Sequence, residues 1–518
     1  LYCLFVMFIS PPNETLSHRA GLSNSVRGLD RYEDVLKNKE LTPVLPSWSR
    51  PGGELMGFEI IDDYTFQFKF AKSFPAMLYF MKMWAIPELT PRHFLEQYHI
   101  DYNPEANELA KEHGFDFWYQ LYGRMTDWRY AGETGLPLLY SWIPVSFSTN
   151  EIIMERNPYY WVVDSEGNQL PYIDRIRAVQ VSPDAYDMNA ISKDIDVAAY
   201  QAVLSSYPLY RRNEELGDYT TYLWDKASGF ELAYMFNLTT EDLVLRDVFQ
   251  DLRFRQAMSL AINREEINQV LYFGRATPAQ ASVHPSTSYY EPEFGEAYAE
   301  YDVDRANQLL DEMGLKWDDS HTWRLRPDGK PLTIVVEHVS TEEAPITAVS
   351  ELVAEYWNKV GIQTVLRMHS WDLWIQRMQA NEHDATVWWG GEESEVPFTA
   401  FAKYFVPGAN WWGSWWCPLW ERTWSGKEGG EPLPPVLEQI YETYDLMIST
   451  VDDEERIAAG KEIMRIQAEN LWIIGTVVNA PQPIIVSNRV HNVPEESQWG
   501  CDMHFWRIGK APQWFIAD

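Results

Sequence analysis

The central part of the chain alternates short apolar runs with amphipathic segments of helical period. The expected strands and helices follow one another in the order 332–336, 346–360, 362–366, 371–380 and 385–389. Parallel strands need a crossover connection between them, and a helix of this length supplies one. Because this alternation is typical of a parallel or mixed sheet covered by helices, we predict an α/β protein.

Local signals predict further elements on either side of this region. Apolar alternation indicates strands, helical periodicity indicates helices, and an Asp at a helix start indicates an N-cap. The further expected elements are two strands within 58–70 turning at Asp62-Asp63, a helix at 104–125, a helix capped by Asp251, a helix capped by Asp304, a loop at 405–432, a helix at 452–470 and a strand at 471–478.

The length of 518 residues is enough for two or three domains, at roughly 100–200 residues per domain. Apolar residues make up 46% of the chain and charged residues 23%, which excludes an intrinsically disordered protein. No apolar run approaches the roughly 18 residues of a membrane-spanning helix. The first nine residues are apolar but carry no basic leader, so we interpret them as a buried or spurious end rather than a signal peptide.

The acidic composition excludes nucleic acid as a partner. Lys and Arg number 42 against 76 Asp and Glu, a formal net charge of −34, and such a field repels phosphate backbones. The sequence contains none of the local motifs of nucleotide-binding loops, nucleophile elbows or zinc proteases, and its 11 His residues are scattered. We therefore expect neither catalysis nor a metal or cofactor. Three cysteines, Cys3, Cys417 and Cys501, allow at most one disulfide.

Tryptophan is concentrated in one stretch of the chain. Ten of the 24 Trp residues lie close together: Trp371, Trp374, Trp388, Trp389, Trp411, Trp412, Trp415, Trp416, Trp420 and Trp424. An aromatic lining that stacks on sugars or packs on peptide side chains explains this density. A small core beneath a long loop is the alternative, and for any single ring that alternative is favoured. A structural role for all ten is not favoured, so we predict that some of them face a ligand.

Three carboxylates, Glu392, Glu393 and Glu395, follow the predicted strand at 385–389. Ligand groups commonly bind at the carboxyl ends of strands in α/β proteins. A carboxylate beside aromatic rings can accept hydrogen bonds from an ammonium group or from sugar hydroxyls. A solvated acidic turn is the alternative for each of the three.

Several segments carry a family resemblance. They are Glu155–Trp161 (ERNPYYW) with Leu170–Ile176 (LPYIDRI), Phe236-Asn237, Asp251–Glu266 (with RQAMSLAINR), Gly274–Pro278 and Tyr301–Gly314. In this order they resemble motifs of the extracellular solute-binding proteins of family 5, the peptide- and nickel-type receptors of ABC importers. Each motif alone is of low specificity, whereas their common order is specific. The resemblance extends from about residue 31 to the C-terminus.

The resemblance implies a two-lobed, periplasmic-binding-protein-like fold of type II, in its large three-domain variant, with hinge strands around 225–240 and 475–485. The implied domains are an irregular segment 1–30, lobe I with its subdomain at 31–232, lobe II at 233–475, and a return to lobe I at 476–518. The strands with which lobe I of the family begins have no counterpart in the first segment. We therefore expect the N-terminal part of lobe I, on the order of 100–150 residues, to be missing.

The same resemblance implies the substrate-binding component of an ABC importer. Such a component would capture an oligopeptide or similar extended solute between two lobes and deliver it to a permease in the membrane. An oligosaccharide is the alternative ligand. A glycoside hydrolase is the alternative from another functional class, because rings and paired carboxylates also line such sites. We expect a monomer outside the cytoplasm, in the periplasm or anchored to the cell surface as a lipoprotein.

The resemblance also suggests where the ligand binds. Peptide receptors of the family carry a W-x-A-D run whose acid holds the α-ammonium group of the peptide, and Trp389-Gly390-Gly391-Glu392 occupies that place. Glu in place of Asp moves the charge by one methylene, and the Trp-rich lining is similar to longer members of the family, some of which take oligosaccharides. The predicted ligand-binding residues are Trp388, Trp389, Glu392, Asn237, Trp411, Trp412, Trp415 and Trp416.

Overall fold

The computed structural model describes residues 57–62, 65–70, 72–80, 91–199, 202–339, 345–391, 393–408, 415–500 and 510–517. The chain forms two compact units. Unit 1 comprises Leu1–Ser182, Arg489–Val493 and Lys510–Asp518, and unit 2 comprises Pro183–Asn488 and Pro494–Gly509. The lobe boundaries expected from the sequence stay a prediction.

Unit 1 is built from antiparallel strands and short helices. Its three-stranded sheet has the order β3 (Trp142–Phe147), β4 (Glu151–Arg156) and β5 (Arg175–Val179). Two further antiparallel pairs are β1 (Gly57–Ile60) with β2 (Phe66–Lys69), and β16 (Val490–His491) with β18 (Phe515–Ile516). The helices are α3 (Met77–Phe80), α4 (Arg92–Leu95), α5 (Ala106–Glu112), α6 (Trp118–Thr126) and α7 (Ala131–Thr134). The pairing of β1 with β2 confirms the two strands predicted within 58–70.

The extent predicted for one helix of unit 1 is wrong. The segment 104–125 forms two helices, α5 and α6, rather than one. Gly114 lies between them with a φ of +81°, a left-handed conformation that ends α5 and that glycine adopts without steric cost. Leu95, Leu121 and Tyr122 are buried between the two helices and α4, forming a small core.

Unit 2 contains the α/β layer that the sequence predicts. Its five-stranded sheet has the order β11 (Gln363–His369), β10 (Thr333–Val339), β12 (Ala385–Trp389), β8 (Leu232–Phe236) and β13 (Ile474–Gly475). β10 pairs in parallel with both β11 and β12, whereas β8 pairs antiparallel with β12 and β13. The sheet is therefore mixed, as expected.

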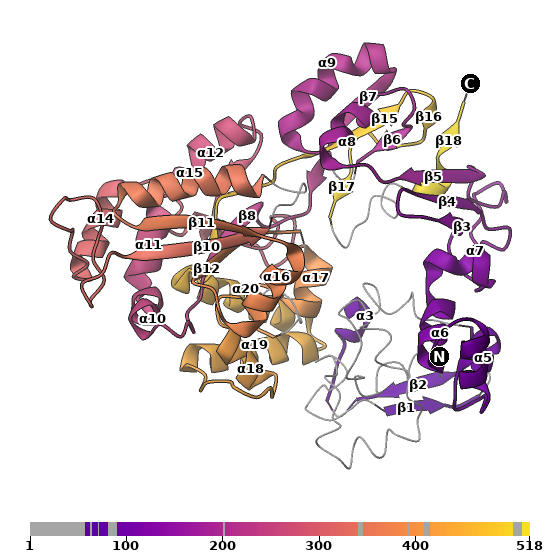
Figure 1. Ribbon diagram of the computed structural model, residues 1–518, viewed down its shortest axis with the longest axis horizontal. Helices are drawn as coiled ribbons and strands as arrows, with labels where there is room; N and C mark the ends of the chain where they lie inside the picture. Colours follow the sequence, from indigo (N-terminus) through magenta and orange to yellow (C-terminus); the bar gives the residue numbers. More distant parts are fainter. Residues whose placement is uncertain are drawn as a thin grey trace. The chain divides into compact units, whose positions relative to one another are not determined.

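Two helices connect the three parallel strands. α15 (Ile346–Lys359) joins β10 to β11, and α16 (Trp371–Ala380) joins β11 to β12. Because the two connections run in opposite directions along the sheet, right-handed crossovers place the helices on opposite faces, and Figure 1 shows them on opposite sides of the strands. The bounds of α16 and β12 are those predicted from the sequence.

A second, four-stranded sheet of unit 2 has the order β17 (Gln498–Trp499), β7 (Tyr219–Lys226), β15 (Gln482–Ser487) and β6 (Val197–Ala198), and β14 (Val477–Val478) pairs with β9 (Thr277–Pro278). The other helices of the unit are α8 (Pro183–Ala190), α9 (Tyr207–Gly217), α10 (Leu243–Gln250), α11 (Leu252–Leu260), α12 (Arg264–Leu271), α13 (Pro292–Glu296), α14 (Val303–Glu312), α17 (Glu395–Phe401), α18 (Pro418–Trp424), α19 (Pro435–Ser449) and α20 (Asp453–Asn470). Its main core lies between the five-stranded sheet and the surrounding helices.

Capping explains where two of these helices start. The side chain of Asp251 accepts a hydrogen bond from the backbone N–H of Arg253 and caps α11, as predicted. The predicted cap Asp304 is wrong, because the carboxylate that accepts from the N–H of Arg305, at 2.8 Å, belongs to Asp302. Asp304 lies in the first turn of α14 instead, where the helix dipole stabilises a negative charge.

Two other expectations about unit 2 are corrected by the structure. The predicted loop at 405–432 contains the helix α18. The predicted strand at 471–478 is divided into β13 and β14, which pair with different strands, β8 and β9. Over the ranges that the structure describes, no helix has the length and apolar character needed to cross a membrane.

Candidate ligand-binding site

The candidate site lies at the carboxyl edge of the five-stranded sheet. Because β10, β11 and β12 are mutually parallel, their carboxyl ends share one edge, which is where α/β proteins commonly bind ligands. β12 ends in Trp388 and Trp389, and Gly390 and Gly391 follow. The sequence thus places two of its predicted ligand residues at this edge.

Four tryptophans form a packed cluster there, which we call the tryptophan stack: Trp374, Trp388, Trp389 and Trp415. The ring of Trp388 is stacked with that of Trp374 of α16, at a centroid distance of 4.6 Å, and with that of Trp389, at 3.8 Å. Trp415 meets Trp374 and Trp388 edge to face, at 4.6 and 5.1 Å. Three of the rings are buried and Trp389 is half-buried. The stack therefore holds Trp389 rigidly while part of that residue faces outward.

Trp416 belongs to the core instead of this stack. Its ring is parallel to that of Trp472, with centroids 4.6 Å apart, and its indole N–H donates to the backbone carbonyl of Tyr404 at 3.0 Å. Trp416 is fully buried. The structure therefore gives this ring a packing role, and its predicted role in ligand binding stays a prediction.

Asn237 is likewise fully buried, at the end of β8. Its amide group donates to Oδ1 of Asn381 at 2.9 Å and to the backbone carbonyl of His383 at 3.0 Å, and its Oδ1 accepts from the N–H and the hydroxyl of Thr239. These bonds fix the turn that leads into β12. The structure thus assigns Asn237 to the support of the site, and direct ligand contact stays a prediction.

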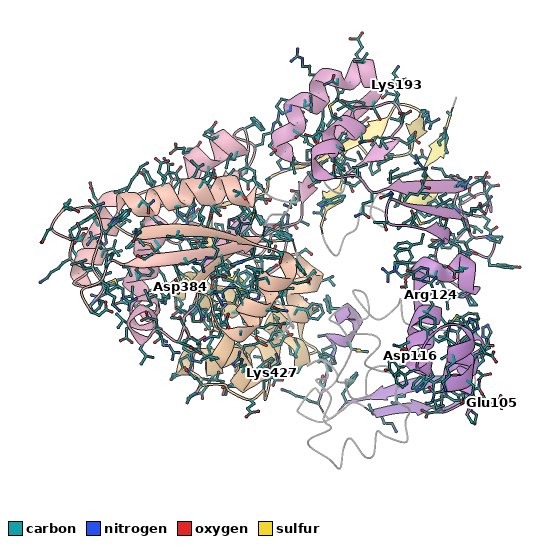
Figure 2. The ribbon with its side chains drawn as sticks, in the orientation of Figure 1. Glu105, Asp116, Arg124, Lys193, Asp384 and Lys427 are labelled. Atoms are coloured by element: carbon teal, nitrogen blue, oxygen red, sulfur yellow. The ribbon has the colours of Figure 1, made fainter. Side chains whose placement is uncertain are left out.

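His383 and Asp384 lie in the same turn. Burial lowers the pKa of His383 to about 4, so the imidazole is neutral near pH 7. Its Nε2 lies 2.7 Å from the backbone carbonyl of Trp415, which can only accept, so Nε2 carries the proton. Asp384, labelled in Figure 2, accepts from the N–H of Val335 at 3.1 Å, and burial raises its pKa. The turn therefore connects the tryptophan stack to the sheet.

Glu393 joins the end of β12 to a distant part of the chain. Its buried Oε2 accepts hydrogen bonds from the backbone N–H of Gly229 at 3.0 Å, the N–H of Gly391 at 2.8 Å and the hydroxyl of Ser228 at 3.3 Å. Its backbone carbonyl also accepts from the N–H of His284. Sequence reasoning named Glu393 only as one of three acids, since its partners on the 228–229 segment leave no local signal.

Two glycines permit this close crossing of chain segments. A Cβ atom at Gly229 would lie 1.8 Å from the backbone oxygen of Ser282, and one at Gly390 would lie 2.2 Å from that of Phe230. Both distances are far below van der Waals contact, so only glycine fits at either position. Beside the crossing, the buried Glu231 forms an ion pair with Lys226 at 2.6 Å, which sequence reasoning missed.

The remaining predicted ligand residues, Glu392, Trp411 and Trp412, lie outside the described residues. Of the described ones, the structure brings Trp388, Trp389 and Trp415 together. Cys417 is buried and free, so the described part of the chain contains no disulfide, while Cys3 and Cys501 lie outside it. Within the same described ranges, no group of His, Cys, Asp and Glu side chains could hold a metal ion.

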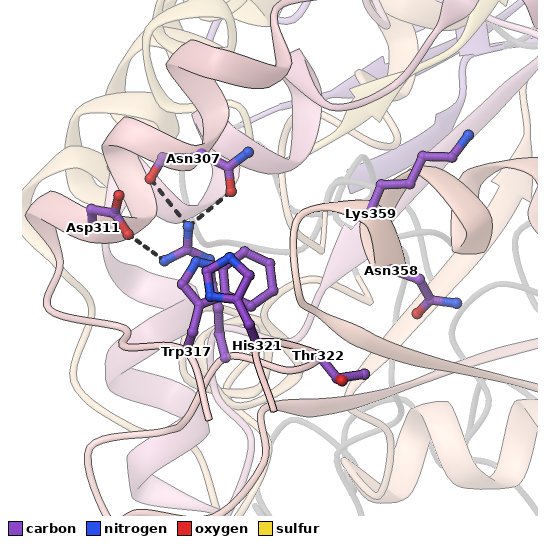
Figure 3. A pocket seen from close by; sticks show the side chains of 8 residues that line it. Asn307, Asp311, Trp317, His321, Thr322, Asn358 and Lys359 are labelled. Atoms are coloured by element: carbon purple, nitrogen blue, oxygen red, sulfur yellow. Dashed lines mark hydrogen bonds and ion pairs between the residues drawn. The ribbon is translucent and has the colours of Figure 1, made fainter. Parts of the chain in front are cut away.

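A separate surface pocket of about 530 Å³ lies on unit 2 between α14, α15 and the 317–324 segment. One of the residues that line it, the buried Arg324, donates to Asn307 and Asp311, bonds that are dashed in Figure 3, and to the carbonyls of Leu315 and Val360. Asn307 accepts from Arg324 through its Oδ1, and its amide N–H donates to the backbone carbonyl of Val303. Because these polar groups bind one another, we interpret the pocket as a packing junction rather than a ligand site.

Comparison with known proteins identifies the family of the chain. Residues 30–412 match the sequence profile described as bacterial extracellular solute-binding proteins, family 5. The chain belongs to this family. The resemblance predicted from the sequence is thereby confirmed, and the α/β fold is that of the family's periplasmic binding proteins.

Three proteins that are similar to this chain illustrate the range of family 5. A solved structure named oligopeptide-binding protein OppA is 34% identical, with a TM-score of 0.68, over 94% of this chain and 78% of that one. The periplasmic binding protein MelB of Agrobacterium fabrum C58, solved in complex with stachyose, is 20% identical, with a TM-score of 0.65, over 94% of this chain and 71% of that one. The periplasmic alpha-galactoside-binding protein of Rhizobium meliloti (strain 1021) is 24% identical over 480 residues. This match covers 89% of the present chain but only 65% of the relative.

Proposed function

We propose that the chain is the ligand-capturing subunit of an ABC importer, that it acts outside the cytoplasm, and that it hands an extended solute to a membrane permease. Membership of the solute-binding family supports this proposal. Closure of two lobes over the solute is part of what the family implies. Catalysis is not part of the proposal, because the family is described by binding alone.

We propose further that the solute is an oligosaccharide. The observation that carries this proposal is the half-buried Trp389 at the end of the tryptophan stack. A flat apolar ring, held in place by buried rings beneath it, suits the apolar face of a sugar, and this packing reduces the side-chain entropy lost when the sugar binds. The names of the galactoside-binding relative and the stachyose complex support the same class of solute.

The carboxylate of Glu393 supports the architecture of the site and is not the ammonium partner that a peptide would need. Recognition of a peptide's α-ammonium group needs a carboxylate whose oxygens face the ligand. Oε2 of Glu393 already accepts three hydrogen bonds from Ser228, Gly229 and Gly391. We therefore assign Glu393 to the architecture of the site rather than to ammonium recognition.

An oligopeptide is the second candidate. The solved structure that shares 34% identity with this chain is named as an oligopeptide-binding protein. Glu392, at the position of the acid in the family's W-x-A-D run, would then hold the ammonium group. This candidate makes a different prediction about which substitution weakens binding.

The experiment measures binding by calorimetry and by intrinsic Trp fluorescence. The probes are stachyose, mannohexaose, a β-glucan hexasaccharide and a mixture of tri- to hexapeptides. We expect at least one oligosaccharide to bind, and Trp389→Ala to weaken it roughly tenfold. The matched control is Trp161→Ala, because Trp161 is 73% exposed in unit 1 and lies outside the stack; we expect it to change nothing.

The outcomes separate the two candidates. Binding of peptides alone, weakened by Glu392→Gln and unaffected by Trp389→Ala, would replace the oligosaccharide by the oligopeptide. Binding of no probe would contradict both. Chromatography of the bound sugar after incubation should return it intact, and its hydrolysis would show that the chain is an enzyme.

A further inference from the structure

A second large ring lies beside the tryptophan stack. Trp371 is the first residue of α16 and is 43% exposed, although its ring lies 5.5 Å from that of Trp388 and 6.1 Å from that of Trp374. Trp374 and Trp388 are buried and are stacked on each other. Trp371 therefore presents an exposed aromatic ring supported by a rigid, buried base.

The helical period explains why this ring emerges at the sheet edge. Positions 371, 374 and 378 lie on one face of α16, since they are three and seven residues apart. Trp374 and Met378 are buried on that face. Trp371 continues the same apolar stripe at the start of the helix, two residues beyond the end of β11. At that point the sheet has ended and can no longer cover the side chain.

Two aromatic residues thus follow the ends of two different strands on the same edge. Trp371 follows β11 and Trp389 ends β12, and these strands are separated by β10. Two inter-strand spacings correspond to about 10 Å between the strand ends. Exposed apolar side chains gather near Trp371 in the sequence, since Met368 is 61% and Leu373 45% exposed.

We propose that Trp371 forms a second aromatic subsite, which receives a further sugar unit of an oligosaccharide bound at Trp389. This inference rests on the proposed function. One stacked sugar unit covers about one ring, so a short ligand at Trp389 does not reach Trp371. A longer ligand gains the second stacking contact, and Trp371 sets the preference for ligand length.

The test compares ligands of two lengths on the 518-residue chain. Stachyose, mannohexaose and the β-glucan hexasaccharide are each compared with melibiose, mannobiose or cellobiose as the matching disaccharide. We expect Trp371→Ala to weaken the long ligand roughly five- to tenfold and to leave the disaccharide within about twofold. Trp389→Ala is expected to weaken both lengths.

Two further variants control for changes in packing. Trp371→Met keeps apolar bulk against Trp388 but removes the flat ring, so its affinity for the long ligand should fall as much as that of Trp371→Ala. Trp371→Phe should recover most of the affinity. Thermal unfolding of each variant shows whether the stack remains folded.

The results decide between the two proposals. Equal losses for long and short ligands, or no loss for either, would overturn the second subsite while the proposed function stands. Full retention of long-ligand affinity by Trp371→Met would overturn it as well, because the flat ring would then be dispensable. Failure of the unsubstituted chain to bind any of these oligosaccharides would overturn the second subsite together with the oligosaccharide as the proposed solute.

Discussion

Oε2 of Glu393 accepts a hydrogen bond from the backbone N–H of Gly229, 164 residues earlier in the sequence, at 3.0 Å. The bond ties the crossing between the two sheets of unit 2 to the end of β12, where Trp389 lies. The same oxygen accepts from the N–H of Gly391, so one carboxylate fixes both sides of the crossing. The position of the candidate binding ring therefore depends on a residue that we do not assign to ligand contact.

Replacement of Glu393 should destabilise unit 2. Glu393→Ala leaves the buried N–H of Gly229 and the part-buried N–H of Gly391 without their acceptor, and we expect the free energy of unfolding to fall by about 2–4 kcal/mol. Glu393→Gln keeps an acceptor oxygen and should cost less than half as much. Denaturant unfolding measures both variants. Equal stability of Glu393→Ala and the unsubstituted chain would show that the carboxylate does not hold the crossing.

The glycine at the crossing should not tolerate a methyl group. A Cβ at position 229 meets the backbone oxygen of Ser282 at 1.8 Å, and we expect Gly229→Ala to reduce stability by more than about 3 kcal/mol or to prevent folding. Gly123 in α6 is the matched control, since a Cβ there meets nothing within 4 Å. Gly123→Ala should raise stability by about 0.5–1 kcal/mol, because Ala is the better helix former. Similar melting curves for the two variants would contradict the close approach at Gly229.

Arg324 should act as a structural junction rather than as a ligand residue. Its guanidinium donates to the carbonyls of Leu315 and Val360 and to the side chains of Asn307 and Asp311. Arg324→Met leaves the buried carbonyls of Leu315 and Val360 without their donor, and we expect a loss of about 3 kcal/mol in unfolding free energy. Arg465→Met, on an exposed side chain of α20, should change stability by less than about 1 kcal/mol. Unchanged stability of Arg324→Met would instead favour a functional use of the pocket.

Stability should fall as the pH drops from about 6.5 to 4. His383 has a pKa of about 4 in the folded chain, because burial disfavours its charged form, against an ordinary value of 6.5. Below pH 6.5 the unfolded chain binds a proton that the folded chain does not bind, so protonation favours unfolding. The shift corresponds to about 3 kcal/mol, fully present above pH 6.5 and lost by pH 4.

The contribution of His383 is measured as the difference between two chains. His383→Gln keeps a side-chain N–H that can donate to the carbonyl of Trp415 but carries no titratable group. Unfolding of this variant between pH 7 and pH 4 should therefore show a shallower decline than that of the unsubstituted chain. His99 of unit 1, whose pKa burial also lowers to about 4, provides the corresponding variant in the other unit. Parallel declines for His383→Gln and the unsubstituted chain would contradict a buried neutral imidazole.

Local sequence patterns predicted much of unit 2 because the signals are carried by neighbouring residues. The ends of α16 and β12 agree with the structure, since helical and strand periods are read over a few residues. The predicted cap of α14, Asp304, lies two residues after the observed cap, Asp302. Both are equally good caps by residue type, and only the backbone geometry selects one.

The family, the α/β class and the concentration of Trp at one strand end could be predicted from the residues alone, because each is a property of residue order. The sequence by itself could not determine which of those rings are covered. Trp416 is buried against Trp472 and Trp388 against Trp374, while Trp371 and Trp389 keep exposed surface. These differences follow from the folded arrangement, since burial depends on which distant segments pack together. The role of Glu393 is set in the same way, through partners 164 residues away.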